Sequence, residues 1–146
     1  MKPKEFLEQL NEDQVVAAIA AAERGTTGEI RVFISGRRLG RDDIAKRAQA
    51  RFRKLGMTAT RERNAVLIYI VPQDQKFAVI GDRGIHERCG VTFWEAVAAG
   101  MAEGLQRGAF TDAVIGAVHR AGEELARHFP ARGEGPDELP DRVERE

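Results

Sequence analysis

The segment from Asn64 to Val71 constrains the fold most, because it is almost entirely apolar and rich in β-branched residues. This pattern is typical of a central strand covered on both faces of its sheet. The next four residues, 72–75, form a predicted turn, and 76–81 then reads as a strand that pairs back as a hairpin. The chain therefore needs covering elements on both faces of a sheet built around 64–71.

Helical patterns precede this hairpin. Asn11 is a predicted N-cap, and the helix that follows it ends at Gly25. Residues 28–35 alternate between apolar and polar positions, as expected for a strand with one better-buried face. Asp42 begins a second predicted helix, which ends at Gly56. Two parallel strands joined by a helical crossover follow from this order.

Two further helices are predicted after the hairpin. A short helical turn after Gly84 leads to Thr92, which we expect to cap a helix with Glu95 at the capping-box position. A last helix carries an apolar stripe over 114–129. Helices on both faces of a small mixed sheet of three or four strands predict the α/β class, with a three-layer α/β/α sandwich.

The length of 146 residues is typical of one domain. We assign residues 1–130 to this α/β/α domain. Residues 131–146 hold six acidic and three basic residues with few apolar ones, which predicts an acidic, flexible tail.

Composition excludes several classes of protein. Lys+Arg and Asp+Glu both number 23, and this balance argues against a dedicated nucleic-acid binder. Cys89 is the only cysteine, so an intrachain disulfide is impossible. The N-terminus lacks the pattern of a signal peptide, and no window approaches the roughly 18–20 apolar residues of a membrane span. We therefore expect a soluble, cytoplasmic protein without a transmembrane segment.

The predicted topology brings polar residues together at one edge of the sheet. The hairpin strand ends at Gly81-Asp82, beside the beginning of the central strand at Arg63-Asn64. If the first strand neighbours the central one, its start at 26–29 also lies there. Carboxylate and amide oxygens of this kind suit Ca²⁺ or Mg²⁺. Gly81 and Gly84 would let the backbone turn sharply and approach a ligand.

A structural interpretation of the same edge stays open. In it, Asp82 caps the following helical turn, and Arg83 pairs with Glu29 across the edge.

Standard catalytic motifs are absent from the sequence. Glu95, rather than an arginine, stands six positions after Cys89, and the chain has no Walker A loop and no Gly-x-Gly-x-x-Gly. Ser35 is the only serine and lies outside a nucleophile elbow. We therefore assign no catalytic residue, and any hydrolysis would depend on a metal and carboxylates.

The predicted helix 42–55 lies in a strongly basic stretch. Residues 37–63 include ten basic and three acidic residues, although the whole chain is neutral. Such a surface could attract a phosphate-bearing substrate, an anionic lipid surface or an acidic protein. A solvated helix face, partly neutralised by the acidic tail, is the alternative.

Several separated segments resemble the signature of the TPM domain family. The segments are Thr26-Thr27-Gly28-Glu29-Ile30, Arg63-Asn64-Ala65-Val66-Leu67-Ile68 and Phe77-Ala78-Val79-Ile80-Gly81-Asp82-Arg83-Gly84-Ile85. The likeness extends over about residues 10–141 in the same order. It implies an α/β/α sandwich, and it places the family's motifs on Glu29, Asn64, Gly81, Asp82 and Gly84.

The resemblance implies a site more firmly than a reaction, since some members are described as phosphatases, some bind calcium, and others are accessory or assembly factors. Our first hypothesis is a divalent-cation and anion-binding site with weak phosphatase activity. In it, Asp82 and Glu29 hold Ca²⁺ or Mg²⁺, Asn64 orients a ligand, and Arg83 holds an anionic group. The alternative is a non-catalytic protein-interaction or assembly-factor module, whose partner binds the basic helix 42–55 or the same cleft.

The sequence departs from the family pattern in three respects. Many members carry a signal peptide and a membrane anchor, whereas neither is expected here. Ala65 stands where a glycine is usual, and Asp137 stands where the tail motif usually has asparagine.

Overall fold

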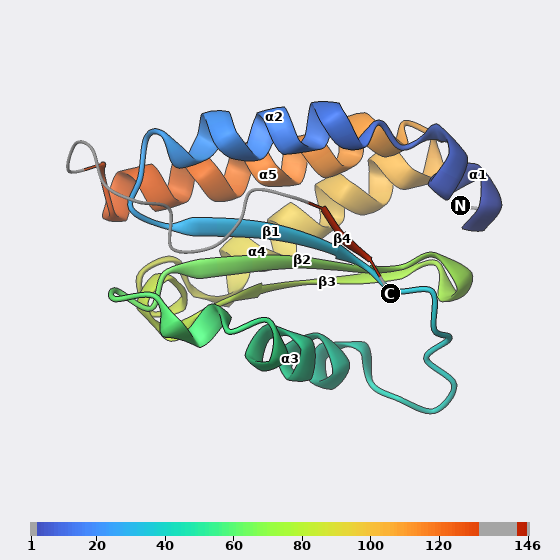
Figure 1. Cartoon of the computed structure of the whole chain (residues 1–146), viewed down its shortest axis with the longest axis horizontal. Helices are drawn as coiled ribbons and strands as arrows, with labels where there is room; N and C mark the ends of the chain where they lie inside the picture. Colours follow the sequence, from blue (N-terminus) through green and yellow to red (C-terminus); the bar gives the residue numbers. More distant parts are fainter. Residues whose placement is uncertain (1–2, 132–142, 146) are drawn as a thin grey trace.

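Four strands form one mixed sheet in the order β3-β2-β1-β4 (Figure 1). The computed structural model describes residues 3–131 and 143–145. β1 runs parallel to β2 and to β4, whereas β3 pairs with β2 in the antiparallel sense. The prediction of a small mixed sheet is confirmed. The strands are β1 (Glu29–Ile34), β2 (Ala65–Val71), β3 (Lys76–Gly81) and β4 (Val143–Arg145).

Helices cover both faces of this sheet (Figure 1). Helix α3 (Ile44–Lys54) lies on one face, followed by the short 3₁₀ turn η1 (Met57–Ala59). Helices α2 (Glu12–Glu23), α4 (Arg83–Gln106) and α5 (Phe110–His128) lie on the other, with α1 (Pro3–Gln9) at one end. A second 3₁₀ turn, η2 (Pro72–Asp74), joins the hairpin strands. The predicted three-layer α/β/α sandwich is therefore confirmed.

The alternation of side chains along the strands divides the core in two. In β1, Ile30 and Val32 belong to the cluster beneath α2, α4 and α5, whereas Phe33 belongs to the cluster beneath α3. Every residue of β2 is buried, as expected for a strand covered on both faces. The continuous apolar run in the sequence thus reflects the central position of β2.

Helix α4 consists of two helical segments joined at a kink, as the sequence predicted, but the break lies slightly earlier than expected. The first segment begins directly at Arg83, and the non-helical residue at the kink is Gly90, with φ 75° and ψ 174°. The sequence placed the start of the second segment at Thr92. A positive φ is easy only for glycine, so the break falls where the chain has no Cβ and not at the capping residue.

The end of the chain supplies a strand that the sequence pattern did not predict. β4 lies along β1, with Val32 opposite Val143. There the Arg31 side chain, only 4% exposed, faces Glu144 at 3.6 Å. Three mostly polar residues carry too little periodicity to indicate a strand. The rest of the predicted tail, 132–142 with Asp137, lies outside the described residues.

Candidate functional site

The predicted edge of the sheet is assembled as the topology requires. Glu29, at the start of β1, pairs with Ala65, at the start of β2. The backbone N–H of Asp82, just after β3, donates to the Ala65 carbonyl at 2.9 Å. Glu29, Ala65 and Asp82 therefore form a row across three strands. Both carboxylate residues are buried.

Asp82 has two partners within this edge. Its carboxylate accepts from Arg63 at 2.6 Å (Nε to Oδ2) and 2.9 Å (Nη2 to Oδ1). The same Oδ1 accepts the backbone N–H of Arg83 at 2.8 Å, which makes Asp82 the N-cap of α4. The predicted capping role is confirmed. The arginine that binds Asp82, however, is Arg63, whereas Arg83 contributes its N–H and exposes its side chain.

Arg63 is held in place by both its side chain and its backbone. The hydrogen bond to Asp82 raises the pKa of the Arg63 guanidinium above its ordinary value. Arg63 also adopts a positive φ of 53°, which is uncommon for a residue other than glycine. Its carbonyl accepts the N–H of Gly84 at 2.8 Å. The bidentate geometry is the strongest form of an arginine–carboxylate contact.

Gly81 and Gly84 allow neighbouring parts of the chain to pack closely at this edge. A Cβ on Gly84 would lie 2.2 Å from the Glu62 carbonyl oxygen, and one on Gly81 would lie 2.3 Å from the Trp94 ring. Real Cβ atoms do not approach so closely. In this structure, both positions therefore serve close packing between β3, α4 and the segment before β2.

The N-terminus of α4 has little capacity left for a bound anion. Such an end binds anions through N–H groups that lack a partner within the helix. Here the N–H of Arg83 donates to the Asp82 side chain, that of Gly84 donates to Arg63, and that of His86 donates to the Asp82 carbonyl at 2.9 Å. The chain's own oxygens occupy these donors.

Asn64 belongs to a second set of contacts at the same edge. Its side chain is buried, and Nδ2 donates to the Thr27 hydroxyl oxygen at 3.1 Å. The Thr27 hydroxyl donates in turn to Glu62 Oε1 at 3.1 Å. The side chain of Asn64 thus joins the segment before β1 to the segment before β2.

A divalent cation does not fit this arrangement as it stands. Ca²⁺ and Mg²⁺ need several oxygen ligands around one point. Both oxygens of Asp82 already face Arg63, and Glu29 lies on the far side of Ala65. Over 3–131 and 143–145, no group of three or more His, Cys, Asp or Glu residues could hold a metal ion. We therefore derive no reaction step through a metal.

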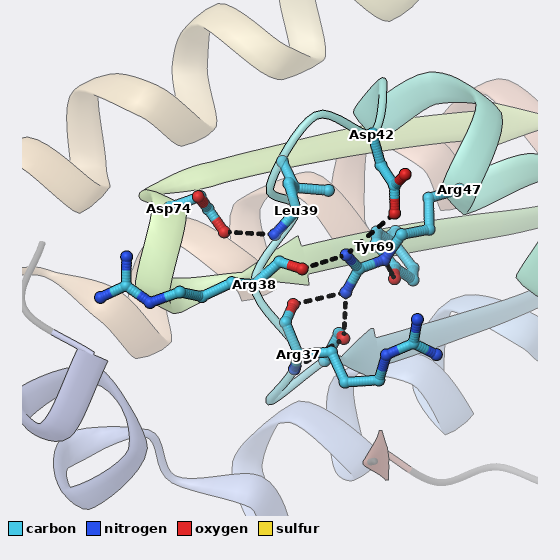
Figure 2. A network of polar contacts seen from close by, with 8 residues as sticks. Arg37, Arg38, Leu39, Asp42, Arg47, Tyr69 and Asp74 are labelled. Carbon is cyan, nitrogen blue, oxygen red and sulfur yellow. Dashed lines mark hydrogen bonds and ion pairs between the residues drawn. The ribbon is translucent and has the colours of Figure 1, made fainter.

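The opposite end of the sheet contains a second organised arginine (Figure 2). Arg47, on α3, donates to the Tyr69 hydroxyl at 3.0 Å and to the Ser35 hydroxyl at 2.8 Å. It also donates to the carbonyl of Arg38 at 2.7 Å and to that of Arg37. Its side chain is only 11% exposed. These acceptors are all neutral, so the charge of Arg47 is not cancelled by them.

A polar cavity of about 180 Å³ adjoins this network, between α3 and the loop after β1. Among the described residues, the acidic one that lines it is Asp42, whose side chain is 59% exposed and lies 3.8 Å from Arg47. The four basic residues that line it are Arg37, Arg47, Arg51 and Lys54. Basic residues therefore outnumber acidic ones among the described residues that line the cavity.

The sequence indicated a basic helix, with a solvated helix face as the alternative, but it did not indicate this cavity. The available signal was the spacing of Arg47, Arg51 and Lys54, which lie on one face of a helix, adjoining the apolar stripe. The second signal was polar groups on the strands themselves, at Ser35 and Tyr69. Their approach to Arg47 depends on tertiary structure.

Comparisons with known proteins agree with this architecture. The NMR structure of the BA42 protein from the psychrophilic bacterium Bizionia argentinensis is similar with a TM-score of 0.85 and 32% identity, covering 94% of this chain and 96% of that chain. The solution NMR structure of the N-terminal domain of the cg2496 protein from Corynebacterium glutamicum has a TM-score of 0.61 and 12% identity, covering 81% and 75%. The second likeness concerns the fold alone.

No helix in the described part of the chain combines the length and apolar character needed to cross a membrane. Among curated proteins, none matches the chain. The family model of the TPM domain matches residues 1–124, which is most of the sequence. The chain therefore belongs to the TPM domain family.

Proposed function

We propose that this TPM domain is a non-catalytic binding module that docks an acidic protein segment on its basic surface. The observation that carries the proposal is the charge of α3, in which all five charged side chains are basic. Three exposed arginines of the preceding loop extend the same surface. We define the basic surface by its exposed residues, which are Arg37, Arg38, Arg41, Lys46, Arg53 and Lys54.

The opposite sides of α3 have different roles. Ala48 and Phe52 are buried against the sheet and fix the helix in position. Lys46, Arg53 and Lys54 remain exposed. A rigid helix that concentrates one sign of charge attracts a complementary partner and speeds its association. The neutral balance of the whole chain favours an acidic protein over a nucleic acid.

The arrangement of the predicted site at the edge 81–84 favours binding over chemistry. A metal-dependent hydrolase needs carboxylates free to hold an ion and activate water. Asp82 instead binds Arg63 and caps α4. The proposal therefore assigns the edge at 81–84 to the framework and the basic surface to the partner.

A charge-reversal experiment tests the proposal. The double variant Lys46→Glu/Arg53→Glu is titrated with a fluorescein-labelled poly-glutamate peptide, and anisotropy gives the Kd. We expect the wild-type chain to bind, the double variant to bind at least about tenfold more weakly, and added salt to weaken the wild type. Arg107→Glu is the control, since Arg107 is the C-cap of α4, its side chain is 68% exposed, and it lies outside the basic surface.

Two outcomes would contradict the proposal. One is equal weakening by Arg107→Glu, which would indicate a response to net charge alone. The other is metal-dependent turnover of a phosphomonoester that is lost in Asp82→Asn, which would make the domain an enzyme.

A second candidate function is divalent-cation binding at Asp82 and Glu29. It is favoured by the burial of both carboxylates at one edge of the sheet, although Ala65 lies between them. Binding of Ca²⁺ or Mg²⁺ would require Arg63 to leave Asp82. An NMR titration with each cation should then shift the amides of 81–84 and the Arg63 Nε–H together. Absence of those shifts at millimolar metal would eliminate this candidate.

A further inference from the structure

We infer that the cavity between α4 and α5 is a binding site for a small amphipathic carboxylate, a molecule with one carboxylate group and a short apolar body. The cavity has a volume of about 360 Å³. Both helices lie on the face of the sheet opposite to α3 (Figure 1). The inference therefore goes beyond the proposed function and does not depend on the basic surface.

One face of each helix lines the cavity, at positions i, i+3, i+4 and i+7. On α4 this face consists of Val97, Gly100, Met101 and Gly104. On α5 it consists of Ala113, Gly116, Ala117 and Arg120. Apart from Arg120 these residues carry no polar side chain, and Val97 and Met101 are almost completely buried. The floor of the cavity is therefore apolar.

Gly100 and Gly116 keep this space open. A Cβ on Gly116 would meet no atom within 4 Å, and one on Gly100 would make only an ordinary contact, 3.5 Å from Arg120 Nη1. Gly104 differs, because its Cβ would lie 2.7 Å from that of Ala113. Glycine inside a helix is less stable than alanine. At positions 100 and 116 this cost has no packing reason, as expected where a site needs the space.

The charged residues of the wall are distributed unequally along the cavity. Arg107 and Asp112 line the end beside the turn that joins α4 to α5, and their charges are opposite. Arg107 also lies 3.9 Å from Glu103. This end therefore has no excess of positive charge that would attract an anion.

Arg120 and His119 line the other end of the cavity. The Arg120 guanidinium donates through Nη1 to the Ala96 carbonyl at 3.0 Å, and its other N–H groups have no partner among the described residues. A guanidinium is always charged and matches the geometry of a carboxylate. His119 supplies a further donor, since an imidazole carries at least one N–H. The anionic group of a ligand is therefore favoured at Arg120.

The size and polarity of the cavity select the ligand class. A volume of about 360 Å³ lies near the lower limit of the roughly 300–1,000 Å³ of small-molecule sites. Such sites have mainly apolar walls and a few polar groups that orient the ligand. A short apolar body against Met101 and Ala113, with its carboxylate at Arg120, uses both parts of the wall.

The test is a ¹H–¹⁵N titration of the full chain with sodium octanoate at constant ionic strength. Octanol, which has the same chain length and no charge, is the matched ligand. We expect saturable shifts confined to residues 97–104 and 112–120. Octanoate should bind about tenfold more tightly than octanol, because only the carboxylate forms a charge-assisted hydrogen bond with Arg120.

Gly116→Leu fills the cavity without changing any charge, and leucine favours helix over glycine. Octanoate affinity should fall by at least about tenfold in this variant. Ala99→Leu is the matched control, because Ala99 is exposed on α4 and outside the cavity. The control should bind octanoate as the wild type does.

A second variant keeps the test decisive if Gly116→Leu disturbs α5. Arg120→Met retains the aliphatic part of the side chain and removes the guanidinium. It should lower octanoate affinity by about tenfold and leave octanol affinity unchanged, so that the preference for the carboxylate disappears.

The inference is overturned by shifts that do not saturate or that centre elsewhere, by equal octanoate affinity in the wild type and Gly116→Leu, or by a carboxylate preference that persists in Arg120→Met. The same proteins separate it from the proposed function. Lys46→Glu/Arg53→Glu should bind octanoate normally, and Gly116→Leu should bind the poly-glutamate peptide normally. Failure of octanoate binding alone refutes the cavity site and leaves the proposed function intact.

Discussion

The two ends of the sheet are each organised by an arginine, but the partners of the two arginines differ. Arg63 makes a bidentate contact with the buried carboxylate of Asp82. Arg47 instead bonds to hydroxyl and carbonyl oxygens, and its nearest acid, Asp42, is largely exposed. Arg63 therefore fixes the backbone at the start of α4, whereas Arg47 fixes a loop.

The difference shows that an arginine can organise two parts of a fold with different electrostatic results. A carboxylate cancels the guanidinium charge and leaves little field for a ligand. Neutral oxygens position the guanidinium equally well, and its charge still acts on the surroundings. Arg63 thus pairs with an acid at the end that has the recognisable motif, whereas Arg47 bonds mainly to neutral oxygens at the other end.

The largest effect on stability is expected for Gly84→Ala, which would disrupt the close packing at the 81–84 edge. The new Cβ would meet the backbone oxygens of Glu62 and Arg63 at 2.2 and 2.6 Å, and backbone cannot move aside cheaply. We expect a loss of about 3 kcal/mol in the free energy of unfolding, measured by urea denaturation. Gly116→Ala is the control, because nothing lies within 4 Å of its Cβ position and alanine favours helix. Equal stability of the two variants would show that the 81–84 edge is not tightly packed.

Arg47→Met is expected to have the next largest effect on stability, and it tests whether Arg47 fixes only the loop after β1. Methionine preserves the aliphatic part and removes all the hydrogen bonds to the loop. We expect a loss of about 1–2 kcal/mol in unfolding free energy. The amides of 37–39 should also exchange faster with deuterium, while those of 83–86 are unchanged. Uniformly faster exchange would contradict a role restricted to the loop.

Two replacements of Asp82 separate its charge from its capping role. Asp82→Asn keeps an N-cap acceptor but loses the charge that faces Arg63, whereas Asp82→Ala loses both. The alanine variant should be less stable than the asparagine variant by about 1 kcal/mol, the usual contribution of an N-cap. Thermal unfolding of both proteins at low and high salt measures this difference. Identical stability would mean that the cap is not needed at this end.

Asp42→Asn should have the smallest effect on stability and the opposite effect on binding. The Asp42 side chain is exposed and lies 3.8 Å from Arg47, so its loss should change the unfolding free energy by less than about 0.5 kcal/mol. It removes an acid that lies beside the basic surface, so the affinity for the poly-glutamate peptide should rise about two- to threefold by anisotropy titration. A fall in affinity would mean that Asp42 helps to form the site.

The fold could be predicted from the sequence because its signals are local. The apolar run at 65–71 identified the central strand, and Asn11 and Asp82 were recognised as helix caps from their immediate neighbours. The topology then followed from the order of strands and one helical crossover. The convergence of Glu29, Asn64 and Asp82 on one edge was predictable for the same reason.

The contacts within the two ends could not be predicted, because they join residues that are far apart in sequence. The sequence suggested Arg83 as a partner of Glu29 or of an anion, and it did not indicate the contact that Arg63 makes with Asp82. The contacts of Arg47 depend on Ser35 and Tyr69, which come from two different strands. As a result, the strongest sequence motif of the candidate site, residues 81–84, serves close packing in this structure.

The pairing of β4 with β1 has a consequence for the order in which the molecule can fold. β1 precedes the other strands in the chain, yet its partner on one side, β4, follows all the other described elements. During synthesis, the β4-facing edge of β1 stays open until β4 has been made, while β2 pairs with β1 and the helices form. Contacts between such distant residues form late and slow the final step. The newly made protein should therefore pass through a nearly complete form with one unpaired edge, in which self-association is the main risk.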